Sequence, residues 1–228
     1  MLQAVIFDFD GVIADSEPIH CRAFLEVLPQ FGFPLTEDMY YRDYLGYTDA
    51  DALDVLSRDL KVPIDEATRR RALELKSRRF EELIQNEKPI ISGVPAFVRM
   101  LHSNRIPLGI CSGALRSDID LILEGSELQG VFDVVVSADD VTKGKPDPQG
   151  FVLTLHRLSD TVGRSIPAES CVVIEDSLWG LQAAKTAGMK RIAVTHTYPS
   201  GQLAPQADRV VNSLGELTLS DLHSLCVQ

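Results

Sequence analysis

Short apolar runs rich in β-branched residues recur along most of this chain, and helical patterns separate them. This alternation is typical of a parallel sheet with helices on both faces. We predict strands at residues 3–8, 106–112, 131–138, 171–176, 191–196 and 209–212. The clearest helical patterns lie at residues 94–103, 115–124, 148–158 and 178–187. The sequence therefore predicts an α/β fold.

The alternation is interrupted between about residues 16 and 90, where helical patterns follow one another without a convincing strand. The longest of them runs from residue 65 to about residue 86 and carries Leu73, Phe80 and Leu83 on one face. A helical block after the first strand of a parallel sheet indicates an inserted domain. We therefore predict an α/β core of residues 1–15 and 91–228 and a helical domain of residues 16–90.

The composition argues against two classes of partner. The formal net charge is −11, and an acidic surface repels nucleic-acid backbones and anionic lipids. No apolar run approaches the roughly 20 residues of a membrane-spanning helix, and the N-terminus shows no export signal. The four cysteines are scattered singly, as is typical of reduced thiols. We expect a cytoplasmic protein that binds neither nucleic acid nor membranes.

Acidic side chains close two of the predicted strands. Asp8 and Asp10 lie two residues apart, so both can address one ligand, and Gly11 lets the chain turn behind them. Glu175 and Asp176 end a strongly apolar run and supply the oxygen ligands that Mg²⁺ prefers. Each pair also has an ordinary structural explanation, because aspartates are common at strand ends and acidic residues favour helix N-termini.

Two other motifs could hold an anion. Ser112 and Gly113 follow the strand at residues 106–112 and offer a hydroxyl and backbone N–H groups. Lys145 lies in a loop that prolines stiffen, which could fix the direction of its side chain. The ordinary alternatives are a simple turn and a solvated basic loop. Ligands bind at the carboxyl ends of strands in open α/β sheets, and all four motifs are predicted there.

The order of these motifs (Asp-x-Asp-Gly, then Ser, then Lys-Pro, then Glu-Asp) resembles that of the haloacid dehalogenase superfamily. The resemblance spans nearly the whole chain. The helical block at residues 16–90 is similar to the inserted cap of the branch that contains β-phosphoglucomutase and many small sugar-phosphate phosphatases. The resemblance implies a Rossmann-like parallel sheet core with an inserted all-helical cap domain.

The resemblance also implies roles for the core residues. Asp8 would attack phosphorus and form an aspartyl phosphate, and Asp10 would protonate the leaving oxygen and later deprotonate a water molecule. Mg²⁺ would be held by the Asp8 carboxylate, the Asp10 carbonyl and Asp176, with Glu175 nearby or ligating through water. The residues implied to bind the phosphoryl oxygens are Ser112, Gly113 and Lys145.

Four cap positions resemble substrate-facing positions of the same branch, and they are His20, Gly46, Tyr47 and Lys76; Arg116 is a further substrate candidate. Lys76 could meet a distal anionic group of the substrate when the cap closes, or it could be a solvated helix lysine. Arg116 could reach the rim of the pocket or simply begin a helix.

Asp10 favours phosphate chemistry, because the dehalogenases of the superfamily do not keep this second aspartate. The β-phosphoglucomutase pattern has an arginine soon after the cap glycine and a Ser-Lys-Asn stretch after the second motif. Both are missing here, at residues 46–49 and 113–116. We therefore predict a monomeric Mg²⁺-dependent phosphatase of a small phosphorylated sugar or polyol. A β-phosphoglucomutase-like phosphomutase and a non-catalytic module that binds phosphorylated metabolites are the alternatives.

Overall fold

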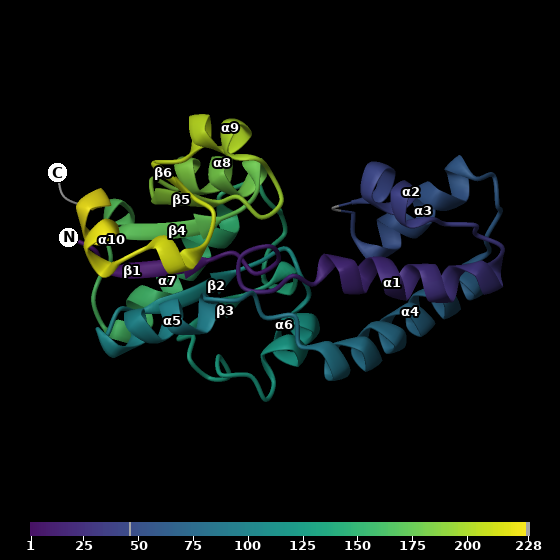
Figure 1. Ribbon diagram of the computed structural model, residues 1–228, viewed down its shortest axis with the longest axis horizontal. Helices are drawn as coiled ribbons and strands as arrows, with labels where there is room; N and C mark the ends of the chain where they lie inside the picture. Colours follow the sequence, from purple (N-terminus) through teal and green to yellow (C-terminus); the bar gives the residue numbers. More distant parts are fainter. Residues whose placement is uncertain (46, 227–228) are drawn as a thin grey trace. The chain divides into compact units, whose positions relative to one another are not determined.

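The computed structural model describes residues 1–45 and 47–226. Within these residues the chain divides into two compact units, whose elements are labelled in Figure 1. The α/β unit combines residues 1–15 with the chain from Pro89 onward, and it contains every strand of the described residues. The helical unit comprises residues Ser16–Lys88. The sequence analysis placed the two boundaries after residues 15 and 90.

A six-stranded parallel sheet forms the α/β unit. Its strands are β1 (Ala4–Phe7), β2 (Leu108–Cys111), β3 (Val134–Val136), β4 (Cys171–Glu175), β5 (Lys190–Val194) and β6 (Arg209–Val211). Their order across the sheet is β3-β2-β1-β4-β5-β6, and each strand overlaps a run predicted from the sequence. The order reverses between β1 and β4, and such a reversal is where open α/β sheets bind ligands. The predicted fold class is confirmed.

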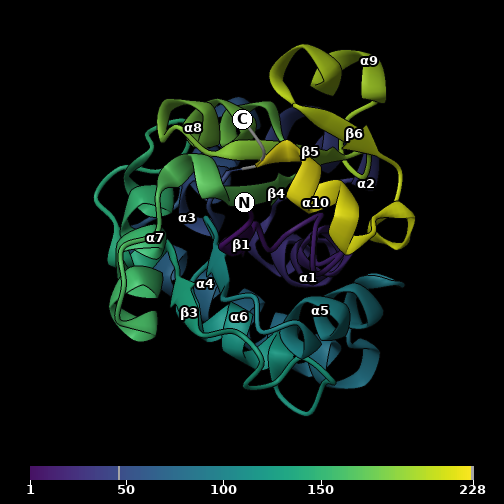
Figure 2. The same ribbon diagram turned by 90° about the vertical axis from the view of Figure 1, so that its left-hand side faces the viewer.

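Helices cover both faces of this sheet. They are α5 (Val94–Ser103), α6 (Arg116–Leu123), α7 (Gln149–Val162), α8 (Leu178–Thr186), α9 (Ser200–Leu203) and α10 (Leu219–Leu225). Figure 2 shows α7 and α8 on one face and α5 and α10 on the other. Because both faces are covered, every residue of β1 and β4 is buried, which explains why these strands read as continuous apolar runs.

An apolar cluster fastens the sheet to α7 and α8. Ile6 of β1 and Val173 of β4 pack with Phe151 and Leu158 of α7 and with Ala183 of α8, and all five side chains are buried. Burial of a large apolar side chain contributes about 1.5–3 kcal/mol to folding. The packing therefore fixes the strand ends from which the polar motifs emerge.

The helical unit contains α1 (Glu17–Val27), α2 (Glu37–Met39), α3 (Asp49–Asp59) and α4 (Glu66–Glu87). Asp65 caps α4 by accepting a hydrogen bond from the Thr68 N–H at 2.7 Å. The core of the unit includes Phe24, Phe33 and Leu53, all of them buried. No helix of the described residues is long and apolar enough to cross a membrane.

Gly109 of β2 provides a test of the packing between the sheet and α7. A methyl group at this position would lie 2.7 Å from Thr154 Cγ2 and 3.2 Å from Leu158 Cδ1. Gly109→Ala should therefore lower the free energy of unfolding by about 1–3 kcal/mol through overpacking. Urea unfolding followed by circular dichroism measures this change. Gly201→Ala is the matched control, because a methyl group there meets no described atom within 4 Å. Equal stability of the two variants would contradict the packing described here.

Candidate active site

The register of the sheet places the first and last motifs side by side. Phe7 of β1 pairs with Ile174 of β4, and the Asp8 N–H donates to the Ile174 carbonyl at 2.9 Å. Asp8 and Glu175 consequently leave neighbouring strands at the same level. Phe7 also pairs with Ile110 of β2, so that Ser112 emerges on the other side of Asp8. The parallel sheet therefore brings together residues that lie more than a hundred positions apart in the sequence.

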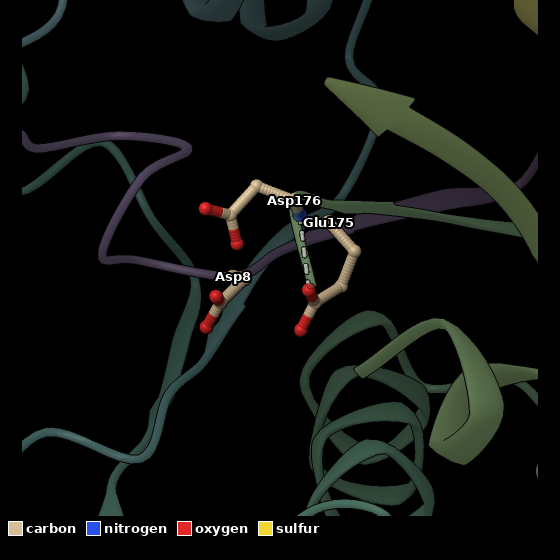
Figure 3. Close-up of side chains that lie close together, drawn as sticks. All are labelled: Asp8, Glu175 and Asp176. Atoms are coloured by element: carbon tan, nitrogen blue, oxygen red, sulfur yellow. Dashed lines mark hydrogen bonds between the residues drawn. The ribbon is translucent and has the colours of Figure 1, made fainter. Parts of the chain in front are cut away.

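Three carboxylates meet at this edge of the sheet (Figure 3). Asp8, Glu175 and Asp176 are all buried, and each offers an oxygen that lies within 4.8 Å of those of the other two. Burial raises the pKa of Asp8 well above its ordinary value, and the negative charge of Glu175 adds to this effect. The same two causes raise the pKa of Asp176 to about 7. The cluster therefore favours any partner that brings positive charge.

Lys145 supplies part of that charge. Its ammonium nitrogen lies 2.6 Å from Asp8 Oδ1 and 2.6 Å from Glu175 Oε1, and it sits 5.2 Å from the centre of the Phe151 ring. Burial by itself disfavours the charged lysine, but Asp8 and Glu175 outweigh it and raise the pKa of Lys145 well above its ordinary value. The ordinary alternative, a solvated basic loop, is therefore wrong for this side chain.

The charges of the cluster fit a divalent cation. Three carboxylates and one ammonium group leave two formal negative charges, which one divalent cation would balance. Closely spaced carboxylate oxygens are also the donors that hard cations such as Mg²⁺ prefer. The residues present at the strand ends can therefore hold such an ion.

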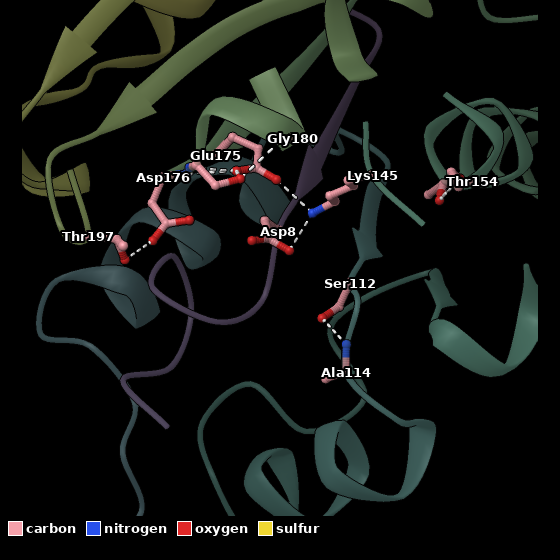
Figure 4. Close-up of polar contacts among 11 residues, drawn as sticks. Asp8, Ser112, Ala114, Lys145, Thr154, Glu175, Asp176, Gly180 and Thr197 are labelled. Atoms are coloured by element: carbon pink, nitrogen blue, oxygen red, sulfur yellow. Dashed lines mark hydrogen bonds and ion pairs between the residues drawn. The ribbon is translucent and has the colours of Figure 1, made fainter. Parts of the chain in front are cut away.

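Both oxygens of Glu175 are engaged within the protein (Figure 4). Oε1 accepts the hydrogen bond from Lys145, and Oε2 accepts from the N–H groups of Asp176 at 3.0 Å and Ser177 at 2.8 Å and from the Ser177 hydroxyl at 2.8 Å. Ser177 in turn caps α8 by accepting from the Gly180 N–H. The carboxylate thus lies at the positive end of α8, and its hydrogen bonds hold Lys145 beside Asp8.

Asp176 is held by a residue that the sequence analysis missed. The hydroxyl of Thr197, in the segment that follows β5, donates to Asp176 Oδ2 (Figure 4). This hydrogen bond opposes the effect of burial on the pKa of Asp176. The sequence analysis proposed no site residue beyond Asp176. Applying the strand-end rule to hydroxyl residues after the predicted strand at 191–196 would have found Thr197.

Ser112 and Asp10 follow the ends of two strands of the site, β2 and β1. The Ser112 side chain is buried, its hydroxyl accepts from the Ala114 N–H at 3.0 Å, and its own N–H donates to the Val136 carbonyl. The backbone N–H groups of Ser112 and Ala114 are therefore engaged within the protein, and the anion-binding role of Ser112 and Gly113 stays a prediction. Asp10 lies in the loop after β1, where Gly11 has a positive φ of 75° and donates its N–H to Ala14.

Lys76 in the helical unit is buried, so the alternative of a solvated helix lysine is wrong. Its ammonium nitrogen lies 2.7 and 2.6 Å from the two Asp49 carboxylate oxygens and 2.5 Å from His20 Nδ1. The rings of Phe24 and Phe80 lie about 5 Å from the same nitrogen, at 4.9 and 5.0 Å. The sequence analysis did not identify Asp49 as a partner, although it compensates the charge of Lys76.

His20 accepts the hydrogen bond from Lys76, because an ammonium group can only donate. The proton of the neutral imidazole is therefore assigned to Nε2. Burial, together with the neighbouring charge of Lys76, lowers the pKa of His20 well below its ordinary value. The ring also stacks on Phe80 with centroids 4.0 Å apart. His20 is thus an uncharged member of the Lys76 cluster.

The other predicted substrate positions differ in their surroundings. Gly46 lies outside the described residues. Tyr47 is exposed. Arg116 begins α6, and its side chain donates to Asp120 one turn further along the helix at 2.9 Å. Its backbone N–H donates to Asp139. Arg116 therefore stabilises the start of its own helix.

Comparison with known proteins identifies the family. The family model described as "Haloacid dehalogenase-like hydrolase" matches residues 5–194. The chain belongs to this family. It is 36% identical over 211 residues to the phosphorylated carbohydrates phosphatase of Thermotoga maritima, covering 92% of this chain and 93% of that protein. It is 30% identical over 226 residues to the beta-phosphoglucomutase of Bacillus subtilis, covering 97% of this chain and 94% of that protein.

A solved structure shows the same fold. A mutant of CbbY from Rhodobacter sphaeroides, in complex with xylulose-(1,5)bisphosphate, matches with a TM-score of 0.83 and 26% sequence identity. The match covers 97% of this chain and 99% of that chain. The resemblance to the haloacid dehalogenase superfamily that the sequence analysis identified is therefore confirmed. The relatives include both phosphatases and phosphomutases.

We expect a divalent cation to stabilise the protein more at high pH than at low pH. The raised pKa values of Asp8 and Asp176 mean that the folded, metal-free protein takes up protons that the unfolded chain releases. Its stability should therefore be greatest at low pH and fall as the pH rises through about 7, where Asp176 ionises beside Glu175. Bound Mg²⁺ would remove this repulsion.

Thermal unfolding with Mg²⁺ and with a chelator, at pH values from about 6 to about 8, measures this effect. The difference between the two melting temperatures should widen as the pH rises. Asp176→Asn removes one of the repelling charges and should narrow the difference at high pH. A difference that stays the same at every pH would contradict the proposed competition between protons and metal.

Proposed function

We propose that this protein is a Mg²⁺-dependent phosphatase of a small sugar or polyol phosphate and that Asp8 is its nucleophile. The observation that carries the proposal is the environment of Asp8. This buried carboxylate lies at the carboxyl end of β1, 2.6 Å from the Lys145 ammonium group and within reach of Asp176. The family match and the 36% identity to a phosphorylated carbohydrates phosphatase support the same chemistry.

In the proposed reaction the Asp8 carboxylate attacks phosphorus, and the bond to the leaving oxygen breaks as the aspartyl phosphate forms. Asp10 gives a proton to that leaving oxygen. A water molecule then attacks the phosphoaspartate and loses its proton to Asp10, which releases inorganic phosphate and restores Asp8. The chemistry is balanced, because Asp10 gives one proton in the first step and regains one in the second.

The remaining residues position the phosphoryl group and offset its charge. Asp8, the Asp10 carbonyl and Asp176 would hold Mg²⁺, which supplies positive charge against the developing charge on the phosphoryl oxygens. Glu175 would lie near the ion without being one of its main ligands, because its two oxygens accept hydrogen bonds from Lys145 and from the backbone at the start of α8. Lys145 and the Ser112-Gly113 turn would bind the non-bridging oxygens of the phosphoryl group.

The charges in the helical unit favour a phosphatase over a phosphomutase. A mutase of this kind must retain a substrate with two phosphoryl groups, which calls for a second site of positive charge. Lys76 is a buried cation of the helical unit, but Asp49 neutralises it with two short hydrogen bonds. Substrate contacts of His20, Gly46, Tyr47, Lys76 and Arg116 stay predictions. The phosphomutase is the second candidate, and the 30% identity to a beta-phosphoglucomutase supports it.

Release of inorganic phosphate from a panel of sugar and polyol monophosphates, with Mg²⁺ present, tests the proposal. Asp8→Asn keeps the size of the side chain but removes the nucleophile, and it should lower kcat by roughly three orders of magnitude or more. Asp160→Asn is the matched control, because Asp160 is exposed on α7 and pairs with His156 of the same helix. The control should keep the wild-type rate.

Other outcomes would favour the alternatives. β-Glucose 1-phosphate should be included, and its products checked for glucose 6-phosphate. Isomerisation with little phosphate release would replace the phosphatase by the mutase. Binding of phosphorylated ligands without turnover, with an affinity that Asp10→Ala leaves unchanged, would favour a non-catalytic module.

A further inference from the structure

Thr197 contacts the acidic cluster without a role in the mechanism above. It lies three residues beyond the end of β5, and its hydroxyl donates to Asp176 Oδ2. Strands β4 and β5 pair Glu175 with Ala193, so the segment after β5 runs past the residue that follows β4. Thr197 therefore reaches Asp176 from a different strand end than Asp8 or Lys145.

Gly11 packs against Asp176 Oδ2 from the loop after β1. A Cβ atom at Gly11 would lie 1.9 Å from Asp176 Oδ2 and 3.1 Å from Thr197 Oγ1. The Asp176 carboxylate thus sits directly against the backbone of the loop after β1, in space that any side chain at position 11 would fill. Two separate loops, one after β1 and one after β5, enclose Oδ2.

The second oxygen of Asp176 points the other way. Figure 4 shows that this oxygen is turned toward Asp8, away from Thr197. Oxygen atoms of Asp8 and Asp176 lie within 4.8 Å of each other, which is close enough for both to bind one ion. The two Asp176 oxygens are therefore unequal: one is bonded to Thr197, and the other faces the nucleophile.

We propose that Thr197 is a positioning residue, which holds Asp176 Oδ2 so that Oδ1 stays turned toward a cation shared with Asp8. The inference rests on the proposed Mg²⁺ dependence and adds a residue to it. Without this hydrogen bond the carboxylate would rotate, and repulsion from Asp8 and Glu175 would drive it away from the cluster. Carboxylates that bind metals are commonly held by such hydrogen bonds, whose loss weakens metal affinity about 10–100-fold.

Thr197→Val is the direct test, because valine has nearly the shape of threonine and lacks the hydroxyl. The dissociation constant of Mg²⁺, measured by titration calorimetry on the full chain without substrate, should rise by about 10-fold or more. Thr197→Ser keeps the hydroxyl and should bind Mg²⁺ within about twofold of the wild type. Thr195→Val is the matched control, since the Thr195 hydroxyl bonds Asn212 and lies in the same segment. Its Mg²⁺ affinity should be unchanged.

Enzyme kinetics give a second readout. The rate of phosphate release by Thr197→Val should recover as the Mg²⁺ concentration is raised, while the KM for the sugar phosphate at saturating Mg²⁺ stays at the wild-type value. A general structural defect would not be corrected by Mg²⁺. Circular dichroism with a chelator checks the fold independently of the metal.

The outcomes separate this inference from the proposed function. If the wild-type chain binds no Mg²⁺, the proposed metal dependence itself fails. If the wild type binds Mg²⁺ and Thr197→Val binds it equally well, only the positioning role is overturned. Loss of fold in Thr197→Val and also in Thr197→Ala would make Thr197 a structural residue, and this too would overturn the inference.

Discussion

The mutual repulsion of three buried carboxylates is the constraint on which the site depends. Removing charged groups from water costs several kcal/mol each, and like charges at short distance add to that cost. Asp8, Glu175 and Asp176 are nevertheless brought together because strands β1 and β4 are neighbours and end at the same level. The apolar packing of the sheet holds them there. The surrounding contacts make this arrangement tolerable, and together they reach all three carboxylates.

Each of these contacts engages particular carboxylate oxygens. Lys145 pairs with Asp8 and Glu175, the start of α8 takes the second oxygen of Glu175, and Thr197 takes one oxygen of Asp176. Glu175 is thereby saturated by protein groups. Asp8 and Asp176 are the two carboxylates that could share a cation. Gly180 is part of the same solution, because a Cβ atom there would lie 1.6 Å from Glu175 Oε1 and would push the carboxylate off the helix end.

Much of the fold and the four motifs could be predicted from the sequence, because their signals are local. A strand buried on both faces is a continuous apolar run, and the polar residue that follows it marks the end of the strand. Partners that come from distant segments give no such signal. Thr197 is one example, since its place after a predicted strand puts it at the same edge of the sheet but does not indicate a contact with Asp176. Asp49 is another, because it meets Lys76 across 27 positions of the chain.

For Lys76 the helical periodicity indicated a buried position, but the charge of the side chain favoured a solvated one. It lies midway between Ala72 and Phe80 at helical spacing, and all three are buried. The periodicity alone would have placed it on the inner face of α4. A long charged side chain is usually read as solvated, and a buried one requires a partner that the sequence does not reveal.

The two units balance their buried charges differently. In the helical unit, Lys76 and Asp49 cancel each other, and His20 is held neutral, so the cluster has no net charge to offer a second phosphoryl group. In the α/β unit, one lysine lies beside three carboxylates, which leaves two formal negative charges that a divalent cation would balance. The charges of the helical cluster thus balance each other, whereas those of the α/β cluster leave a negative charge for a cation to balance.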